Sequence, residues 1–156
     1  SLKKLQMKQT IDSHAISSLN DCRLITLNKH HHENGNLTVV EGGKGLPFDI
    51  KRIFYIYDVP GGVERGGRCH IKRTNLLVAV SGSCSVTIND GVDTMTYNLN
   101  RSNVGLLVAP GIWNTLHNFS SGSVVLAISS HDYEPEDYVC DFDEFLDRTA
   151  PKRNND

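Results

Sequence analysis

The sequence predicts an all-β fold, a sandwich or jelly-roll barrel, followed by one short C-terminal helix. Apolar segments recur about every 8–12 residues, and clusters of Gly, Asn, Asp and Ser separate them, which is the pattern of a β-sandwich or barrel. The 13 glycines among 156 residues fit a chain that turns often. Helix-compatible spacing is confined to the last part of the chain.

The first half of the chain holds three candidate strands, residues 22–27, 37–42 and 50–59. The third, IKRIFYIYDV, is rich in β-branched and aromatic residues, which favour extended structure. Residues 29–36 contain Asn34-Gly35, a pair that adopts positive φ readily, and we predict a turn there. Residues 43–48 are predicted to be a loop.

Six further strands are predicted in the second half, at 75–82, 84–90, 93–100, 104–111, 115–119 and 123–130. The segment NLLVAVSG is almost continuously apolar, as in a strand buried on both faces. The segment CSVTIND alternates, with Val86 and Ile88 on one face, and Cys84 is predicted to pack inward. Residues 58–74, rich in glycine and charge, are predicted to be a turn.

The single predicted helix lies in EPEDYVCDFDEFLDRTA, residues 134–150. Tyr138, Phe142, Phe145 and Leu146 recur at spacings that place them on one helical face. Pro135 fits the first position of such a helix, with acidic residues in its first turn.

Length and charge limit the protein's class. The length fits one domain, and the net charge of −2 gives no sign of binding to nucleic acid or to a membrane surface. No apolar run reaches the roughly 18–20 residues of a membrane helix, and the first ten residues lack the apolar core of a secretion signal. We expect a cytoplasmic protein whose residues 21–150 form the domain. Residues 1–20 are expected to form an arm, either disordered or exchanged with a partner subunit.

Metal binding and disulfides are not expected. The four cysteines are widely spaced, with no C-x-x-C pair, so a zinc site has no support and reduced thiols are favoured. The triplet His30-His31-His32 precedes an Asn-Gly turn, and neighbouring side chains on an extended segment point to opposite faces. We therefore predict no metal site there.

One histidine stands out in the stretch DVPGGVERGGRCHIKRT. His70 lies just ahead of the apolar strand, with Arg65 and Arg68 beside it. A proton-transfer group on the inner wall of a barrel, with cations nearby, suits an enzyme acting on an anionic substrate. A Pro-Gly turn at 110–111 leads into a further strand that carries Trp113 and Asn114.

Four segments together resemble the WxcM-like cupins, over about residues 22–147: GNLTVVEG, PFDIKRIFYIYDVPGGVERGG, LLVAVSGSCSVTINDG and PGIWNTLHNFSSGSVVLAISSHDYEPEDYVCDFDEFL. The resemblance implies a double-stranded β-helix, the cupin fold, in a homodimer whose N-terminal strands cross to the partner. It also implies a sugar 3,4-ketoisomerase that moves the carbonyl of dTDP-4-keto-6-deoxy-glucose from C4 to C3, on the way to 3-amino sugars of surface polysaccharides, without metal or organic cofactor.

The chain departs from this family at two positions. The paired histidines of the family's His-Ala-His-Lys motif fall at Arg68 and His70, so the second histidine is kept and the first is arginine. The residue after Trp113 is often His, Arg or another polar group in the family, and here it is Asn114.

Roles for the candidate residues follow from the isomerisation chemistry. His70 is expected to act as acid and base, and Arg68 to stabilise the enediolate and favour the neutral imidazole. Tyr57, or else Tyr55, is a candidate proton relay if that face of its strand is the barrel interior. Arg65 and Arg52 are candidate phosphate ligands, because guanidinium pairs with phosphate oxygens. Tyr55, Trp113 and Asn114 are the remaining candidate substrate contacts.

The sequence also fits other functions. A metal cupin is disfavoured, because one imidazole among the expected ligand positions cannot hold a divalent ion tightly. A 3,5-epimerase-type or other keto-sugar isomerase of the same fold fits the substitutions at Arg68 and Asn114. A non-catalytic sugar-nucleotide-binding cupin fits the missing first histidine.

Overall fold

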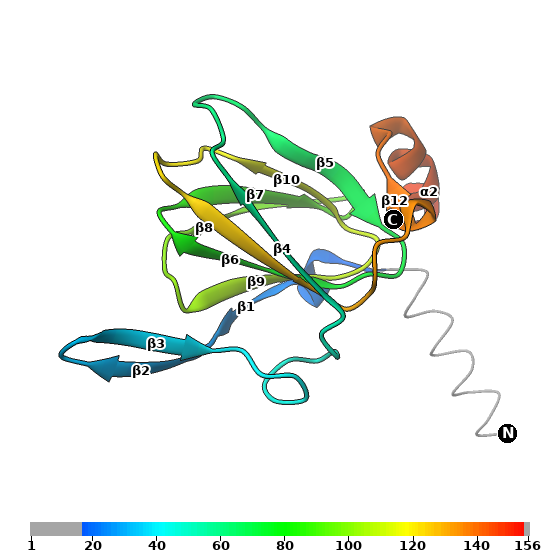
Figure 1. Cartoon of the computed structure of the whole chain (residues 1–156). Coiled ribbons are helices and arrows are strands. Elements are labelled where there is room, and N and C mark those ends of the chain that lie inside the picture. Colours follow the sequence, from blue (N-terminus) through cyan, green and yellow to red (C-terminus); the bar gives the residue numbers. More distant parts are fainter. Residues whose placement is uncertain (1–16, 155–156) are drawn as a thin grey trace, which may run out of the picture.

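Two five-stranded antiparallel sheets face each other and form the body of the protein (Figure 1). The structure, a computed structural model, describes residues 17–154. The first sheet has the order β1-β9-β6-β11-β4, with bounds Arg23–Thr26, Val104–Val108, Asn75–Ser81, Val124–Ser129 and Arg52–Tyr57. The second has the order β12-β5-β10-β7-β8, with bounds Tyr138–Val139, Arg65–His70, Trp113–His117, Cys84–Asn89 and Thr94–Leu99.

The remaining elements lie outside these two sheets. They are the hairpin strands β2 (Asn28–His32) and β3 (Gly35–Val39), the 3₁₀ turns η1 (Leu19–Asp21) and η2 (Pro135–Asp137), and the helix α2 (Phe142–Asn154). The hairpin extends away from the two sheets, and α2 lies beside β5 and β12 (Figure 1). The predicted all-β jelly-roll fold with a short C-terminal helix is confirmed.

The main core lies between the two sheets. Val86 and Ile88 of β7, Leu106 of β9 and Val125 of β11 are fully buried there. Cys84 also packs inward, as the alternation of its segment predicts. The sheets are therefore held together by burial of apolar surface from both inner faces.

A second apolar layer covers the outer face of the first sheet. In β6, Leu77 and Ala79 point into the main core, whereas Leu76 and Val78 point outward. The outward residues are covered by side chains of the 40–50 loop: Val40, Leu46, Phe48 and Ile50. The continuous apolar run at 75–82 is thus a strand buried on both faces, as predicted.

The predicted turn at 29–36 is shorter than expected. Residues 28–32 form strand β2, which pairs with β3 from Asn28↔Val39 to His32↔Gly35. Gly35 has φ +127, so the Asn34-Gly35 turn signal is correct. All five residues of β2 are exposed, and a strand that buries neither face leaves no apolar alternation in the sequence.

The long turn predicted at 58–74 contains strand β5, and the prediction there is wrong. Residues 65–70 pair with β10 on one side and with the two-residue strand β12 on the other. Gly66 and Gly67 both have positive φ, so glycine, the residue that most suggests a turn, here makes an irregularity inside a strand.

The helix begins later than predicted. Pro135 starts only the 3₁₀ turn η2, Tyr138 lies in β12, and α2 begins at Phe142. The Asp141 carboxylate accepts hydrogen bonds from the backbone N–H groups of Asp143 and Glu144, at 2.8 and 3.4 Å, and so caps the helix.

The predicted N-terminal arm falls mostly outside the described residues, which begin at 17. Ser18 caps η1, and the backbone N–H of Leu19 donates to the Asp90 carboxylate at 3.1 Å. Lys152 of α2 donates to the carbonyl oxygen of Ser17. Within residues 17–154, no helix is long and apolar enough to cross a membrane.

Candidate active site

A cavity of about 390 Å³ opens between the two sheets, at the edge where β4 and β5 face each other. Its lining combines arginine and tyrosine residues with apolar ones. The lining residues used below are Arg52, Tyr55, Tyr57, Arg65, Arg68, His70, Asn114, Tyr133 and Tyr138. Leu77 and Leu116 belong to the apolar part.

Strand β5 supplies the central groups. Arg68 and His70 are two residues apart and both line the cavity, whereas Cys69 between them packs with Val139 and Phe145 on the other face. Gly66 has φ +86, and a Cβ there would come within 3.0 Å of the Asn114 carbonyl oxygen. Glycine therefore lets β5 approach β10 at the point where Arg68 pairs with Asn114.

His70 is held as a neutral imidazole. The residue is 7% exposed. Burial, followed by the positive charge of Arg73, lowers the pKa of His70 to about 4; Arg68 and Arg52 act in the same direction and Asp137 in the opposite one. At neutral pH the ring therefore carries a lone pair that can accept a proton.

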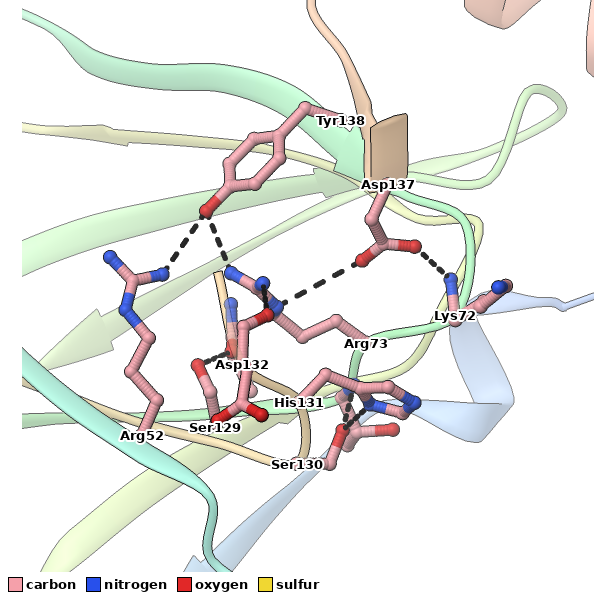
Figure 2. A network of polar contacts seen from close by, with 11 residues as sticks. Arg52, Lys72, Arg73, Ser129, Ser130, His131, Asp132, Asp137 and Tyr138 are labelled. Atoms are coloured by element: carbon pink, nitrogen blue, oxygen red, sulfur yellow. Dashed lines mark hydrogen bonds and ion pairs between the residues drawn. The ribbon is translucent and has the colours of Figure 1, made fainter. Parts of the chain in front are cut away.

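One tyrosine and two arginines form a hydrogen-bonded network (Figure 2). The Tyr138 hydroxyl oxygen accepts hydrogen bonds from Nη1 of Arg73 at 2.7 Å and from Nη1 of Arg52 at 3.3 Å. The rings of Tyr138 and His70 meet edge to face, with centroids 4.7 Å apart. The network thus fixes the ring that contacts the candidate base.

Arg73 is the buried anchor of this network. It is 1% exposed, and its Nη2 donates to the Asp132 carbonyl oxygen at 2.6 Å. Its Nε lies 3.9 Å from Oδ2 of the buried Asp137, whose Oδ1 accepts from the backbone N–H of Lys72 at 2.7 Å. Figure 2 shows these groups converging from the 130–138 segment and from the connection between β5 and β6.

Arg68 keeps unused hydrogen-bonding capacity. Its Nε is buried without a partner, and its guanidinium lies 5.4 Å from the centroid of the Tyr138 ring. Across the sheet, Nδ2 of Asn114 donates to the Arg68 carbonyl oxygen at 3.3 Å, so the amide braces the backbone of β5. A donor that is buried without a partner in a polar cavity points to a ligand that would satisfy it.

Arg52 and Arg65 also line the cavity. The Arg52 guanidinium stacks on Phe54 and Tyr133, at 4.7 and 5.1 Å from the ring centroids. Together with Arg68 they give the cavity wall three positive charges. Among the cavity-lining residues no carboxylate balances them, which suits an anionic ligand.

The two tyrosines of β4 do not point into the barrel. Phe54 and Ile56 pack against the main core, so the alternating Tyr55 and Tyr57 lie on the opposite face of the strand. They are 60% and 59% exposed and border the mouth of the cavity. A proton relay inside the barrel would need one of these hydroxyl groups to face the interior, and neither side chain does.

Trp113 lies away from the cavity. In β10, Asn114 and Leu116 line the cavity, while Trp113 packs on the other side against Phe142 and Phe145 of α2, with ring centroids 5.2 and 5.5 Å apart. Its contacts are those of a packing residue between the second sheet and the helix. Trp113 is not among the residues that line the cavity, so the structure gives no support to its predicted contact with substrate.

Within residues 17–154, no three His, Cys, Asp or Glu side chains are grouped so as to hold a metal ion. The three consecutive histidines lie on the exposed strand β2, where Nδ1 of His31 is 2.6 Å from the side-chain oxygen of Asn36. Burial raises the pKa of the Cys69 thiol to about 11, and that thiol faces away from the cavity.

The amino-acid sequence also matches a known family model. The family described as FdtA, WxcM-like, C-terminal, matches residues 20–150. The chain belongs to this family. The family predicted from the sequence is confirmed.

Relatives of known activity cover most of the chain. A TDP-4-oxo-6-deoxy-α-D-glucose-3,4-oxoisomerase of Aneurinibacillus thermoaerophilus is 37% identical over 123 residues, which are 79% of this chain and 88% of that protein. A 3,4-ketoisomerase of Helicobacter canadensis superposes with a TM-score of 0.81 at 35% identity, covering 83% of this chain and 98% of that one. QdtA, a sugar 3,4-ketoisomerase of Thermoanaerobacterium thermosaccharolyticum solved in complex with TDP, gives 0.84 at 30% identity, covering 86% and 98%.

Three residues of the site were not predicted from the sequence: Arg73, Asp137 and Tyr138. Arg73 stands in a segment predicted to be a turn, where an arginine is ordinarily solvated. Asp137 and Tyr138 stand in a segment predicted to be helical. The one available signal was that the Asp-Tyr pair belongs to a segment resembling the family, which marks its position without saying that it meets His70.

Proposed function

We propose that this chain is a TDP-sugar 3,4-ketoisomerase that converts dTDP-4-keto-6-deoxy-glucose into the 3-keto isomer without a metal ion. Its relatives carry this activity in their names and cover most of the chain. The observation that carries the proposal is His70, a buried imidazole held neutral in a cavity with three arginines on its wall.

The reaction moves one hydrogen between two carbons. His70 takes the proton from C3, which the neighbouring C4 carbonyl makes acidic, and an enediolate forms. His70 then returns a proton to C4, while the C3 hydroxyl becomes the carbonyl. Arg68, with its unpaired Nε, stabilises the negative oxygen of the enediolate.

The other cavity-lining residues are assigned to substrate binding. Arg52 and Arg65 pair with the pyrophosphate, since guanidinium forks match phosphate oxygens. Tyr55 and Tyr57 contact the nucleotide at the mouth, and Asn114 faces the sugar beside Arg68. Trp113 receives no contact with substrate, because it packs against α2.

A metal is not part of the proposal. The positions where a metal cupin has its ligands hold only one imidazole here, since Arg68 and Asn114 occupy two of them. A guanidinium stays protonated and binds no cation, and a fixed positive charge in the cavity repels one.

We also propose a homodimer in the cytoplasm. The outer face of β4 carries the exposed apolar residue Ile53, and the hairpin adds exposed Leu37 and Val39. Such surface is suited to a second copy of the chain. All four cysteines are free, which fits a reducing compartment.

Incubation of chelator-treated protein with dTDP-4-keto-6-deoxy-glucose tests the proposed function. We expect the 3-keto product, detected by NMR. Deuterium uptake at C5 in D₂O, with no 3-keto product, would indicate a 3,5-epimerase-type enzyme instead. Tight binding of TDP without any exchange would identify a sugar-nucleotide-binding protein.

A further inference from the structure

Moving a ketone between neighbouring carbons requires two proton movements, and His70 accounts for one. The carbon-bound proton leaves C3 and a proton arrives at C4. Separately, the proton of the C3 hydroxyl must leave O3, and O4 must gain one, because the former carbonyl oxygen ends as a hydroxyl. A group that can both give and accept a proton at oxygen is needed for this second movement.

The arginines of the cavity cannot serve, because guanidinium stays charged. Asn114 is an amide that does not titrate and is engaged with the Arg68 carbonyl oxygen. Tyr55 and Tyr57 lie on the outer face of β4. Among the cavity-lining residues other than His70, these exclusions leave Tyr133 and Tyr138 with a hydroxyl to use.

We propose that Tyr138 is a catalytic residue that transfers the oxygen-bound proton from O3 to O4, while His70 transfers the carbon-bound proton from C3 to C4. This inference rests on the proposed function. Tyr138 lines the same cavity as His70, and their rings are in contact at 4.7 Å between centroids. Both groups can therefore reach adjacent atoms of one sugar ring. Tyr133 is 61% exposed, and among the aromatic ring pairs of the described residues it pairs with Tyr138 and not with His70.

The hydrogen bonds of Tyr138 favour this role. Both of its partners, Arg52 and Arg73, are donors only, so the phenol oxygen acts as acceptor in both bonds. Within residues 17–154 no hydrogen bond donated by this hydroxyl is found, so its own proton remains available to the ligand. When the proton passes to O4, two fixed cations stand at hydrogen-bond distance from the oxygen left behind.

The proton balance closes without another reactant. The phenol O–H bond breaks as the O4–H bond forms, and the phenolate then takes the proton from O3. The C3–O3 bond becomes the carbonyl as C4 receives its proton from His70. The tyrosine and the histidine both end in their starting states.

Tyr138→Phe separates the two movements experimentally. Without the hydroxyl, the oxygen proton stays on O3, and His70 can only return its proton to C3. In D₂O we expect deuterium at C3 of recovered substrate at a rate within a few-fold of wild type, and 3-keto product slowed by about a hundred-fold or more. Tyr97→Phe, which removes the hydroxyl of a tyrosine packed against the main core and outside the cavity lining, is the matched control and should change neither rate.

Two results would overturn the assignment. One is product formation by Tyr138→Phe at the wild-type rate. The other is an equal loss of C3 exchange and product, which would show that the ring only positions His70. A wild-type protein that exchanges nothing and forms no product would overturn the proposed function itself.

If the Phe variant does not fold, 3-fluorotyrosine at position 138 keeps the hydroxyl but makes it more acidic. It must then shift the pH profile of product formation and leave that of C3 exchange unchanged.

Discussion

His70 and Tyr138 are directly opposite each other in the register of β5 and β12, and their rings meet at an interplanar angle of 78°. β12 is only two residues long. Its position is fixed by the η2 turn before it and by the backbone bond from the Ile71 N–H to the Asp137 carbonyl oxygen at 2.9 Å. A short segment near the C-terminus thus completes a site built on the barrel.

The depressed pKa of His70 sets the acid limit of activity. A base with a pKa of about 4 is uncharged throughout the physiological range and is lost only on acidification. As the pH is lowered from neutrality, kcat/KM should therefore stay constant to below pH 6 and fall only near pH 4 to 5. A limb centred near 6.5, the ordinary value for histidine, would contradict the buried, cation-flanked ring.

The same shift makes stability depend on pH. Because the folded pKa lies below the unfolded value of 6.5, the unfolded chain binds the proton first between about 6.5 and 4, and stability falls as pH falls through that window. We expect His70 to contribute a loss on the order of 2 kcal/mol at about pH 5 relative to pH 7. Urea unfolding of wild type and His70→Asn over this window checks it: the variant should show the shallower slope.

Arg68 should act on the transition state. Its unpaired Nε and its place beside His70 predict that Arg68→Ala lowers kcat by about 10²–10³-fold, as for removal of a donor to a developing oxyanion. Because Arg68 also lowers the pKa of His70, the acid limb should move upward in the variant. Arg23→Ala, an exposed arginine outside the cavity, is the control. An Arg68→Ala enzyme with wild-type kcat would remove Arg68 from the chemistry.

The buried ion pair should matter more for stability than an exposed one. Asp137→Asn keeps an oxygen for the Lys72 N–H but leaves the charge of Arg73 uncompensated in the interior. We expect a loss of about 3–5 kcal/mol in unfolding free energy. Glu144→Gln, which breaks the exposed pair with Arg148, should cost under about 1 kcal/mol. Equal effects in the two variants would argue against the buried pair as an anchor of the site.

The parts of the fold that bury apolar surface could be predicted from sequence. β6, with two buried faces, and β7, with alternating Val86 and Ile88, leave the periodicities that burial imposes. β5 could not be recognised from the sequence, because it is rich in glycine, arginine and histidine and is held by pairing with a strand on each side. β2 was hidden because neither of its faces is buried.

Of the residues in the candidate site, too, some could be placed from the sequence and others could not. Arg68 and His70 could be placed on one wall because alternation along β5 is local information. The contact with Tyr138 could not, because it joins positions 68 residues apart in sequence (138 − 70) through a two-residue strand without a pattern of its own. The outward direction of Tyr55 and Tyr57 depends on which face of β4 covers the core, and the alternation alone leaves both faces equivalent.

The most direct test of the whole account is proton exchange by His70→Asn in D₂O, followed by NMR with dTDP-4-keto-6-deoxy-glucose. Wild type should place deuterium on the sugar and form the 3-keto isomer. The variant should lose both by at least about a hundred-fold while binding TDP with unchanged affinity by calorimetry. Exchange and turnover by the variant at the wild-type rate would contradict the claim that this neutral imidazole is the catalytic base.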